Sequence, residues 1–227
     1  MSFARPSWAS PLVVAVVWAS PAAAADKPAA PPPAAAPAAA PAVADPEALL
    51  KAFAAAPGLQ ARFSEEQRVE LLAAPLKSEG VLYYARPGLL ARHVTTPAPQ
   101  VLVVDPKQVR FGDGRKMEAI QLADKPVVRQ FVESFLKILQ GDSQGLRRIY
   151  AVDWHAAPDG VWTLSLKPTQ APMDKVIAKV AVRGKGLVVS ELRVVEVGGD
   201  ETITTFRDVD PARIFTDAER KRWFLQP

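Results

Sequence analysis

The chain has 227 residues, and its 28 lysines and arginines against 24 aspartates and glutamates give a formal net charge of +4. It contains no cysteine, which excludes a disulfide scaffold and any metal site built on thiolates. Hydrophobic residues make up 49% and aromatic residues only 7%, so a sizeable core is possible and a stacking platform for single-stranded nucleic acid is disfavoured.

Residues 1–25 have the features of a cleavable signal peptide. Arg5 supplies a positive charge, Pro11–Trp18 is a short apolar run, and Ser20–Ala25 offers small-residue cleavage sites. The alternative is a transmembrane anchor, but the run is about half of the ~20 residues that a spanning helix needs. We therefore expect a soluble, exported product that is located in the periplasm.

Residues 26–45 form a leader rich in proline and alanine, with seven prolines and ten alanines among residues 28–46. Such a composition cannot bury a core and favours an extended, disordered chain. Two interpretations stay open, a semi-rigid spacer and a leader without a role. The folded domain is expected over residues 46–227.

The folded part opens with a short amphipathic helix. Asp45 is a capping residue, Pro46 suits the first helical position, and Pro57-Gly58 ends the helix. Apolar and polar residues then alternate, which predicts strands. These strands cover Leu59–Leu71, Gly80–Arg86, Leu89–Thr95, Val101–Val104 and Gln108–Phe111.

A second helix is expected from Pro126 to the glycine at position 141. Its apolar residues recur at spacings of three and four, as on one face of a helix. They are Val128, Phe131, Val132, Phe135, Leu136 and Leu139.

Further strands with short glycine turns complete the chain, at Ile149–His155, Gly160–Lys167, Val176–Arg183, Leu187–Val197 and Glu201–Val209. Short turns force antiparallel neighbours, and a twisted sheet of nine or ten strands tends to curl. The fold class expected is mainly β with α, an incomplete, half-open antiparallel β-barrel. The two helices would cover its concave apolar face.

Such a fold encloses an apolar cavity, and the periodicities place one set of side chains on its inward faces. This set is Phe63, Leu82, Tyr84, Leu90, Val128, Phe131, Val132 and Phe135. Arg86 follows Leu82 and Tyr84 on the same strand face, at the rim. Its five donors could bind the carbonyls of a helix end and so act as a lid latch, although a surface arginine before a Pro-Gly turn is an equal alternative.

Catalytic constellations are missing from the sequence. It has no G-x-S-x-G elbow, and Asp153 and His155 share a strand face without a nucleophile or a metal set. We therefore expect no enzyme, no cofactor and no metal site. The basic residues are scattered, which argues against nucleic acid. Arg220–Arg222 beside Trp223 could contact an anionic membrane, but a solvated tail is the simpler expectation.

The order of several short motifs resembles the outer-membrane lipoprotein carrier (LolA-like) family of the bacterial periplasm. The family pattern is an F-x-x-x-Q strand, then G-x-L-x-x-x-R-P, then a proline and L-V-x-D. The matching pieces here are Phe63–Gln67, Gly80–Leu82, Arg86-Pro87, Pro97, Val101–Asp105, Leu166–Pro168 and Phe206–Val209.

The resemblance implies a monomeric carrier that takes acyl chains of lipoproteins from an inner-membrane transporter and passes them to an outer-membrane acceptor. Arg86 matches the family's lid-locking arginine. The chain departs from the family pattern at Leu90 and Arg92, where aromatic residues are usual, and in its leader, so a divergent member carrying another acylated lipid is expected. The alternative on the same fold is a regulatory module that senses lipoproteins.

Overall fold

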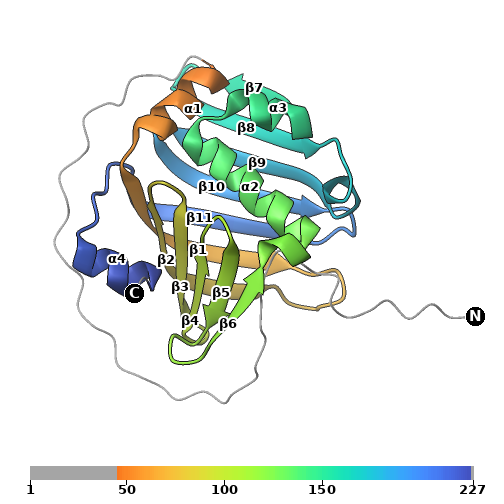
Figure 1. The fold of residues 1–227 in the computed structure, drawn as a ribbon. Coiled ribbons are helices and arrows are strands. Elements are labelled where there is room, and N and C mark those ends of the chain that lie inside the picture. The colour runs from red at the N-terminus through yellow and green to blue at the C-terminus, as the bar shows by residue number, and fades with distance from the viewer. Residues whose placement is uncertain (1–44, 226–227) are drawn as a thin grey trace, which may run out of the picture. The chain divides into compact units, whose positions relative to one another are not determined.

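The computed structural model describes residues 45–225, which form one 11-stranded sheet with helices on both faces (Figure 1). The strand order is β6-β5-β4-β3-β2-β1-β11-β10-β9-β8-β7, and all the pairings are antiparallel. The strands are β1 (Gly58–Arg68), β2 (Leu76–Ala85), β3 (Leu89–Thr96), β4 (Gln100–Val104), β5 (Gln108–Gly112), β6 (Met117–Gln121), β7 (Tyr150–Ala156), β8 (Val161–Pro168), β9 (Ile177–Lys185), β10 (Val188–Glu196) and β11 (Glu201–Asp210).

The sheet curls without closing, because β6 and β7 form its two edges and do not pair with each other. The α-helices are α1 (Pro46–Ala55), α2 (Pro126–Gln140), α3 (Ser143–Ile149) and α4 (Asp217–Phe224), with short 3₁₀ turns at Leu122–Asp124 and Met173–Lys175. Figure 1 shows α1, α2 and α3 across the concave face. The expected fold class, an open antiparallel barrel with helices over its concave face, is confirmed.

Local sequence explains where the two main covering helices begin and end. The Asp45 side chain accepts a hydrogen bond from the Ala48 amide at 2.7 Å, and Pro46 occupies the first helical position of α1. Helix α2 also starts at a proline, Pro126, and stops at Gly141, whose φ of 77° is left-handed. Both helices therefore have the lengths that the capping residue, prolines and glycines of the sequence predict.

A second apolar core lies on the convex face, beneath α4. Tyr83 stacks on Trp223 with ring centroids 5.0 Å apart, and Phe224 is fully buried. Arg110 donates to the carbonyl oxygens of Phe224 and Leu225 at 3.0 and 2.9 Å. The expectation of a solvated tail is therefore wrong, because the two aromatic residues find a partner surface on β2 to β5.

Three elements were not expected from the sequence, namely β6, α3 and α4. The strand expected over 59–71 ends at Arg68, and residues 150–156 form β7 while Ile149 closes α3. The signal peptide and nearly all of the leader lie outside the described residues and stay predictions. Between residues 45 and 225, no helix has both the length and the apolar character that crossing a membrane requires.

Candidate functional site

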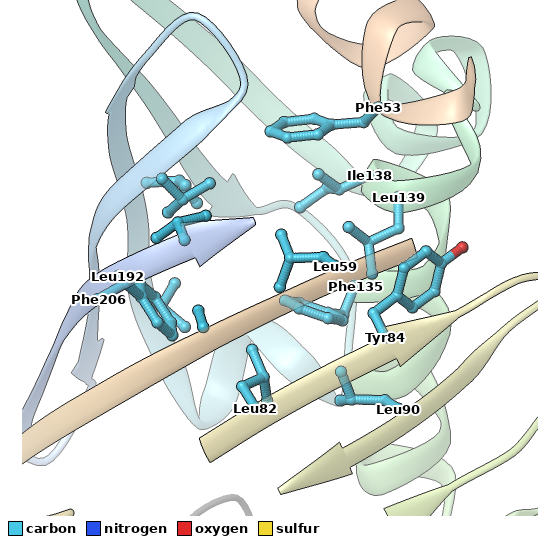
Figure 2. A pocket seen from close by; sticks show the side chains of 14 residues that line it. Phe53, Leu59, Leu82, Tyr84, Leu90, Phe135, Ile138, Leu139, Leu192 and Phe206 are labelled. Atoms are coloured by element: carbon cyan, nitrogen blue, oxygen red, sulfur yellow. The ribbon is translucent and has the colours of Figure 1, made fainter. Parts of the chain in front are cut away.

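An apolar cavity of about 60 Å³ lies between the concave face of the sheet and the helices that cover it (Figure 2). Its walls come from α1, α2 and strands on both sides of β1. The lining residues are Phe53, Leu59, Ala61, Leu82, Tyr84, Leu90, Phe135, Ile138, Leu139, Val182, Val189, Leu192, Phe206 and Val209. Each of these is a hydrophobic residue, so the cavity suits hydrocarbon.

Strand register explains one wall of this cavity. Ala61 lies opposite Leu82 in the β1–β2 pair, and Leu59 lies opposite Tyr84. Tyr84 in turn lies opposite Leu90 in the β2–β3 pair. Because side chains alternate between the faces of a sheet, these five residues all point to the concave side.

The other wall comes from the C-terminal strands. Leu192 of β10 lies opposite Val182 of β9, and Phe206 of β11 lies opposite Phe63 of β1. The pairing of β1 with β11 brings together two halves of the chain that are more than a hundred residues apart. The cavity therefore depends on this long-range pairing.

The size of the cavity decides which state this structure represents. A dry protein cavity of about 150 Å³ holds one benzene molecule, so a cavity of about 60 Å³ is too small for an acyl chain. An acyl chain could enter only if α2 or the sheet moved. This structure is therefore a closed form.

Four of the expected cavity residues, Leu82, Tyr84, Leu90 and Phe135, line the cavity. Sequence reasoning missed the whole wall formed by β9 to β11 and five further lining residues, Phe53, Leu59, Ala61, Ile138 and Leu139. Alternation within the expected strands was the available signal for that wall, but it could not show which strands meet.

The remaining four lie beside the cavity rather than in its lining. Val128 and Val132 belong to the hydrophobic cluster that α2 forms with Tyr84. Phe63 is buried on the concave face, beneath the guanidinium of Arg92, and Phe131 is half-buried on α2. Whether any of the eight residues binds a ligand stays a prediction.

Arg86 does not form the expected latch. Its side chain is exposed, and among the described residues its guanidinium makes no hydrogen bond to a helix carbonyl. The helix supplies the donor instead of the turn: Nε2 of Gln140, at the end of α2, donates to the Pro87 carbonyl at 3.1 Å. The backbone carbonyl of Arg86 accepts from Arg220 at 3.2 Å. A role for Arg86 in ligand transfer stays a prediction.

The Tyr84 hydroxyl is buried and makes no hydrogen bond within the part of the chain that the structure describes. The residue is only 2% exposed, and Figure 2 shows the hydroxyl pointing away from the other labelled side chains. Burial raises the pKa of Tyr84, and the nearby charge of Arg86 opposes this rise. A buried hydroxyl without a partner destabilises the closed form.

A polar cluster lies on the same concave face, next to the cavity. Nη2 of Arg92 lies 2.6 Å from Oε1 of Glu65 and 3.0 Å from the Ser78 hydroxyl. The Thr204 hydroxyl donates to the second carboxylate oxygen of Glu65 at 3.0 Å. The Arg92 guanidinium also lies over the Phe63 ring, 4.5 Å from its centroid. Sequence reasoning noted Arg92 as a departure from the family pattern but did not place it beside the cavity.

Asp153 and His155 are exposed on the edge strand β7, away from the cavity. Residues 45–225 contain no group of three or more histidine, aspartate or glutamate side chains that could hold a metal ion. The concave face thus carries an apolar chamber with one polar cluster beside it.

Comparison with solved structures finds distant likenesses. A LolA superfamily protein from Nitrosomonas europaea is 10% identical, with 76% of this chain and 95% of that chain covered and a TM-score of 0.40. A putative outer membrane lipoprotein-sorting protein domain from Vibrio parahaemolyticus is 9% identical, with 76% and 93% covered and a TM-score of 0.43. The MucA/MucB complex of Pseudomonas aeruginosa gives 11% identity, 75% and 56% coverage and a TM-score of 0.43.

At these identities and TM-scores the likenesses carry no argument about function. No curated protein matches the chain. The family model described as outer membrane lipoprotein carrier protein LolA matches residues 54–219. This match spans most of the chain and nearly all of the described domain, from the end of α1 into α4, so the chain belongs to the LolA family.

Proposed function

We propose that this protein is a periplasmic carrier that binds the acyl chains of lipoproteins, or of another acylated lipid, in the chamber beneath α2. It would ferry them toward the outer membrane. The observation that carries the proposal is the wholly hydrophobic lining of a chamber between a helix and a curled sheet. Membership of the LolA family supports the same direction.

The energetics suit a reversible carrier. Each methylene that leaves water contributes about 0.8 kcal/mol, so about ten methylenes contribute about 8 kcal/mol. Movement of α2, which acts as the lid, away from the sheet separates side chains such as Val132, Leu136 and Leu139 from the strands. The entering chain replaces those lost contacts, which keeps the net affinity moderate and permits release. No covalent step is needed, and we propose that the protein acts by binding alone.

The proposed partners follow from the same chemistry. A carrier of acyl chains needs a donor membrane component and an acceptor membrane component, each of which must displace α2 or compete for the chain. The bond from Gln140 to the Pro87 carbonyl is the hydrogen bond between α2 and the turn that such a partner would break. Its net contribution is of order 0.5–1.5 kcal/mol, small enough for a binding partner to overcome.

The test is binding of a synthetic triacylated lipopeptide to the purified protein, with and without an obstruction in the cavity. Ala61 is 1% exposed and lies in the lining, so Ala61→Phe puts a ring into the space that the ligand needs. We expect this variant to lose at least tenfold in affinity while it stays folded.

The matched control is Ala151→Phe, the same substitution at an exposed position on β7. It should bind as the wild type does. Absence of lipopeptide binding by the wild type, or equal loss in both variants, would count against the carrier function. Mass spectrometry of lipids that co-purify from the periplasm would then identify the natural cargo.

A further inference from the structure

We infer that Arg92, held in place by Glu65, hydrogen-bonds the ester carbonyl oxygens of an acylated ligand, and that the site takes a neutral ester head in preference to an anionic one. This inference rests on the proposed function, because it places the head of a ligand whose chain lies in the apolar chamber.

The first ground is position. Arg92 lies opposite Leu82 in the β2–β3 pair and two residues after Leu90 on β3, and both leucines line the cavity. Residues directly opposite on neighbouring strands have Cβ atoms about 5 Å apart. Arg92 therefore lies at the end of the apolar lining, next to Leu82 and Leu90.

The second ground is the set of donors that remain available. A guanidinium has five N–H donors, and Nη2 of Arg92 uses its two on Glu65 and Ser78. Its Nε and Nη1 make no hydrogen bond to any of residues 45–225. The side chain is 22% exposed, so these donors are reachable. Phe63 fixes the plane of the group by packing against it at 4.5 Å.

The third ground is charge balance. Glu65 already neutralises Arg92 and is itself satisfied by Arg92, Ser78 and Thr204. The pair is partly desolvated, since the Glu65 side chain is only 14% exposed, and this burial lowers the pKa of Arg92 while Glu65 opposes the shift. A phosphate or carboxylate would add a second negative charge without a partner, and such a charge is costly away from water. An ester carbonyl accepts the free donors and adds no charge.

These grounds also give the ligand a direction. Figure 2 shows Leu82 and Leu90 at one side of the cavity and Phe53 at the other. With its ester carbonyls at Arg92, an acyl chain would pass Leu82 and run beneath α2 toward Phe53.

The experiment compares three ligands with equal chain lengths by displacement of a fluorescent acyl probe from the full-length protein. They are didecanoylglycerol, the ether-linked didecylglycerol that lacks carbonyls, and didecanoyl phosphatidate, which is anionic. We expect the wild type to bind the ester about 10- to 100-fold more tightly than the ether, since hydrogen bonds to a charged group are worth that factor. It should bind phosphatidate no more tightly than the neutral ester.

Two variants separate the roles of the pair. The double variant Glu65→Gln/Arg92→Gln removes both charges together, so no buried charge is left unpaired. It should keep the affinity for the ether and lose the ester preference. Glu65→Gln alone leaves the guanidinium uncompensated, and its affinity for phosphatidate should rise at least tenfold over that of the wild type.

The matched control is Arg193→Gln/Glu201→Gln, which removes an ion pair at 2.9 Å from the convex side of the sheet and should change no ligand preference. The inference is overturned if the wild type binds ester and ether equally, if it prefers phosphatidate, or if the Glu65/Arg92 double variant keeps the ester preference. If the wild type binds none of the three ligands, the proposed function fails and the inference fails with it.

Discussion

Replacement of Tyr84 by phenylalanine should stabilise the closed protein. The Tyr84 hydroxyl is buried without a hydrogen-bond partner among the described residues, and the ring packs with Val132, Leu136 and Leu139 of α2. Burying an unpaired hydroxyl costs about 1–3 kcal/mol, and phenylalanine keeps the ring contacts. The free energy of unfolding should therefore rise by about 1–3 kcal/mol, equivalent to roughly 3 °C per kcal/mol for a domain of this size.

The assay is thermal and urea unfolding of Tyr84→Phe beside a matched variant, Tyr150→Phe. Tyr150 is equally buried, but its hydroxyl is not one of the buried groups without a partner, and the Ser134 side chain opposes the rise that burial causes in the pKa of Tyr150. Removal of this hydroxyl, which has a polar neighbour, should lower the free energy of unfolding by about 0.5–1.5 kcal/mol. The two substitutions therefore have opposite expected signs.

The unpaired Tyr84 hydroxyl should also affect the rate of ligand exchange. When α2 lifts, water can reach the Tyr84 hydroxyl, so Tyr84→Phe stabilises the closed form relative to the open form. A free-energy difference of 1–3 kcal/mol lowers the open population by about 5- to 150-fold, and uptake of a fluorescent acyl probe should slow accordingly. If Tyr84→Phe lowers the melting temperature as Tyr150→Phe does, the hydroxyl has a partner in solution and the reasoning is refuted.

Two further predictions follow from contacts of the lid and of the convex face. Gln140→Ala removes the donor to the Pro87 carbonyl and should lower the free energy of unfolding by about 0.5–1.5 kcal/mol. Arg86→Leu replaces an exposed side chain and should change the free energy of unfolding, measured in urea, by less than about 0.5 kcal/mol. Equal losses of stability in Gln140→Ala and Arg86→Leu would contradict the assignment of the helix contact to Gln140. Burial lowers the pKa of His93 below its usual 6.5, so its stabilising contribution is complete above that pH and is lost as the pH falls through the folded-state pKa. Melting temperatures from pH 7.5 to 5.5 should thus fall less in His93→Gln than in the wild type, whereas His155→Gln, at an exposed position, should follow the wild type.

The sequence predicted the part of the concave wall that comes from β2 and β3, because alternation there is regular; from β1 it proposed only Phe63, which lies beside the cavity. Leu82, Tyr84 and Leu90 could be placed on one face from their spacing alone, and the apolar stripe of α2 supplied Phe135. The opposite wall could not be predicted, since no local signal shows that β1 pairs with β11.

The unexpected elements have identifiable physical reasons. Helix α4 is polar along most of its length, and its packing depends on Trp223 and Phe224 at one end. Its sequence therefore has no apolar stripe from which a helix could be predicted. Its capping box, Thr216 with Glu219, was the one available signal.

Arg92 shares the inward face with Leu90, but a charged residue in a strand is ordinarily assigned to the solvent side. Only the contacts with Glu65 and Phe63 show why it stays inside.

The convex-face helix α4 gives the two halves of the sheet different mechanical properties. Strands β2 to β5 are held between α2 on one side and α4 on the other, and Arg110 ties the end of α4 to β5. On β7 to β10 no described helix covers the convex side. Expansion of the chamber should therefore bend the single-layered half while the double-layered half remains stiff. Arg92 and Ser78 of the polar cluster belong to the stiff half, and both contact Glu65 of the adjacent strand β1, so the position of the Arg92 guanidinium would stay constant as the volume beside it changes.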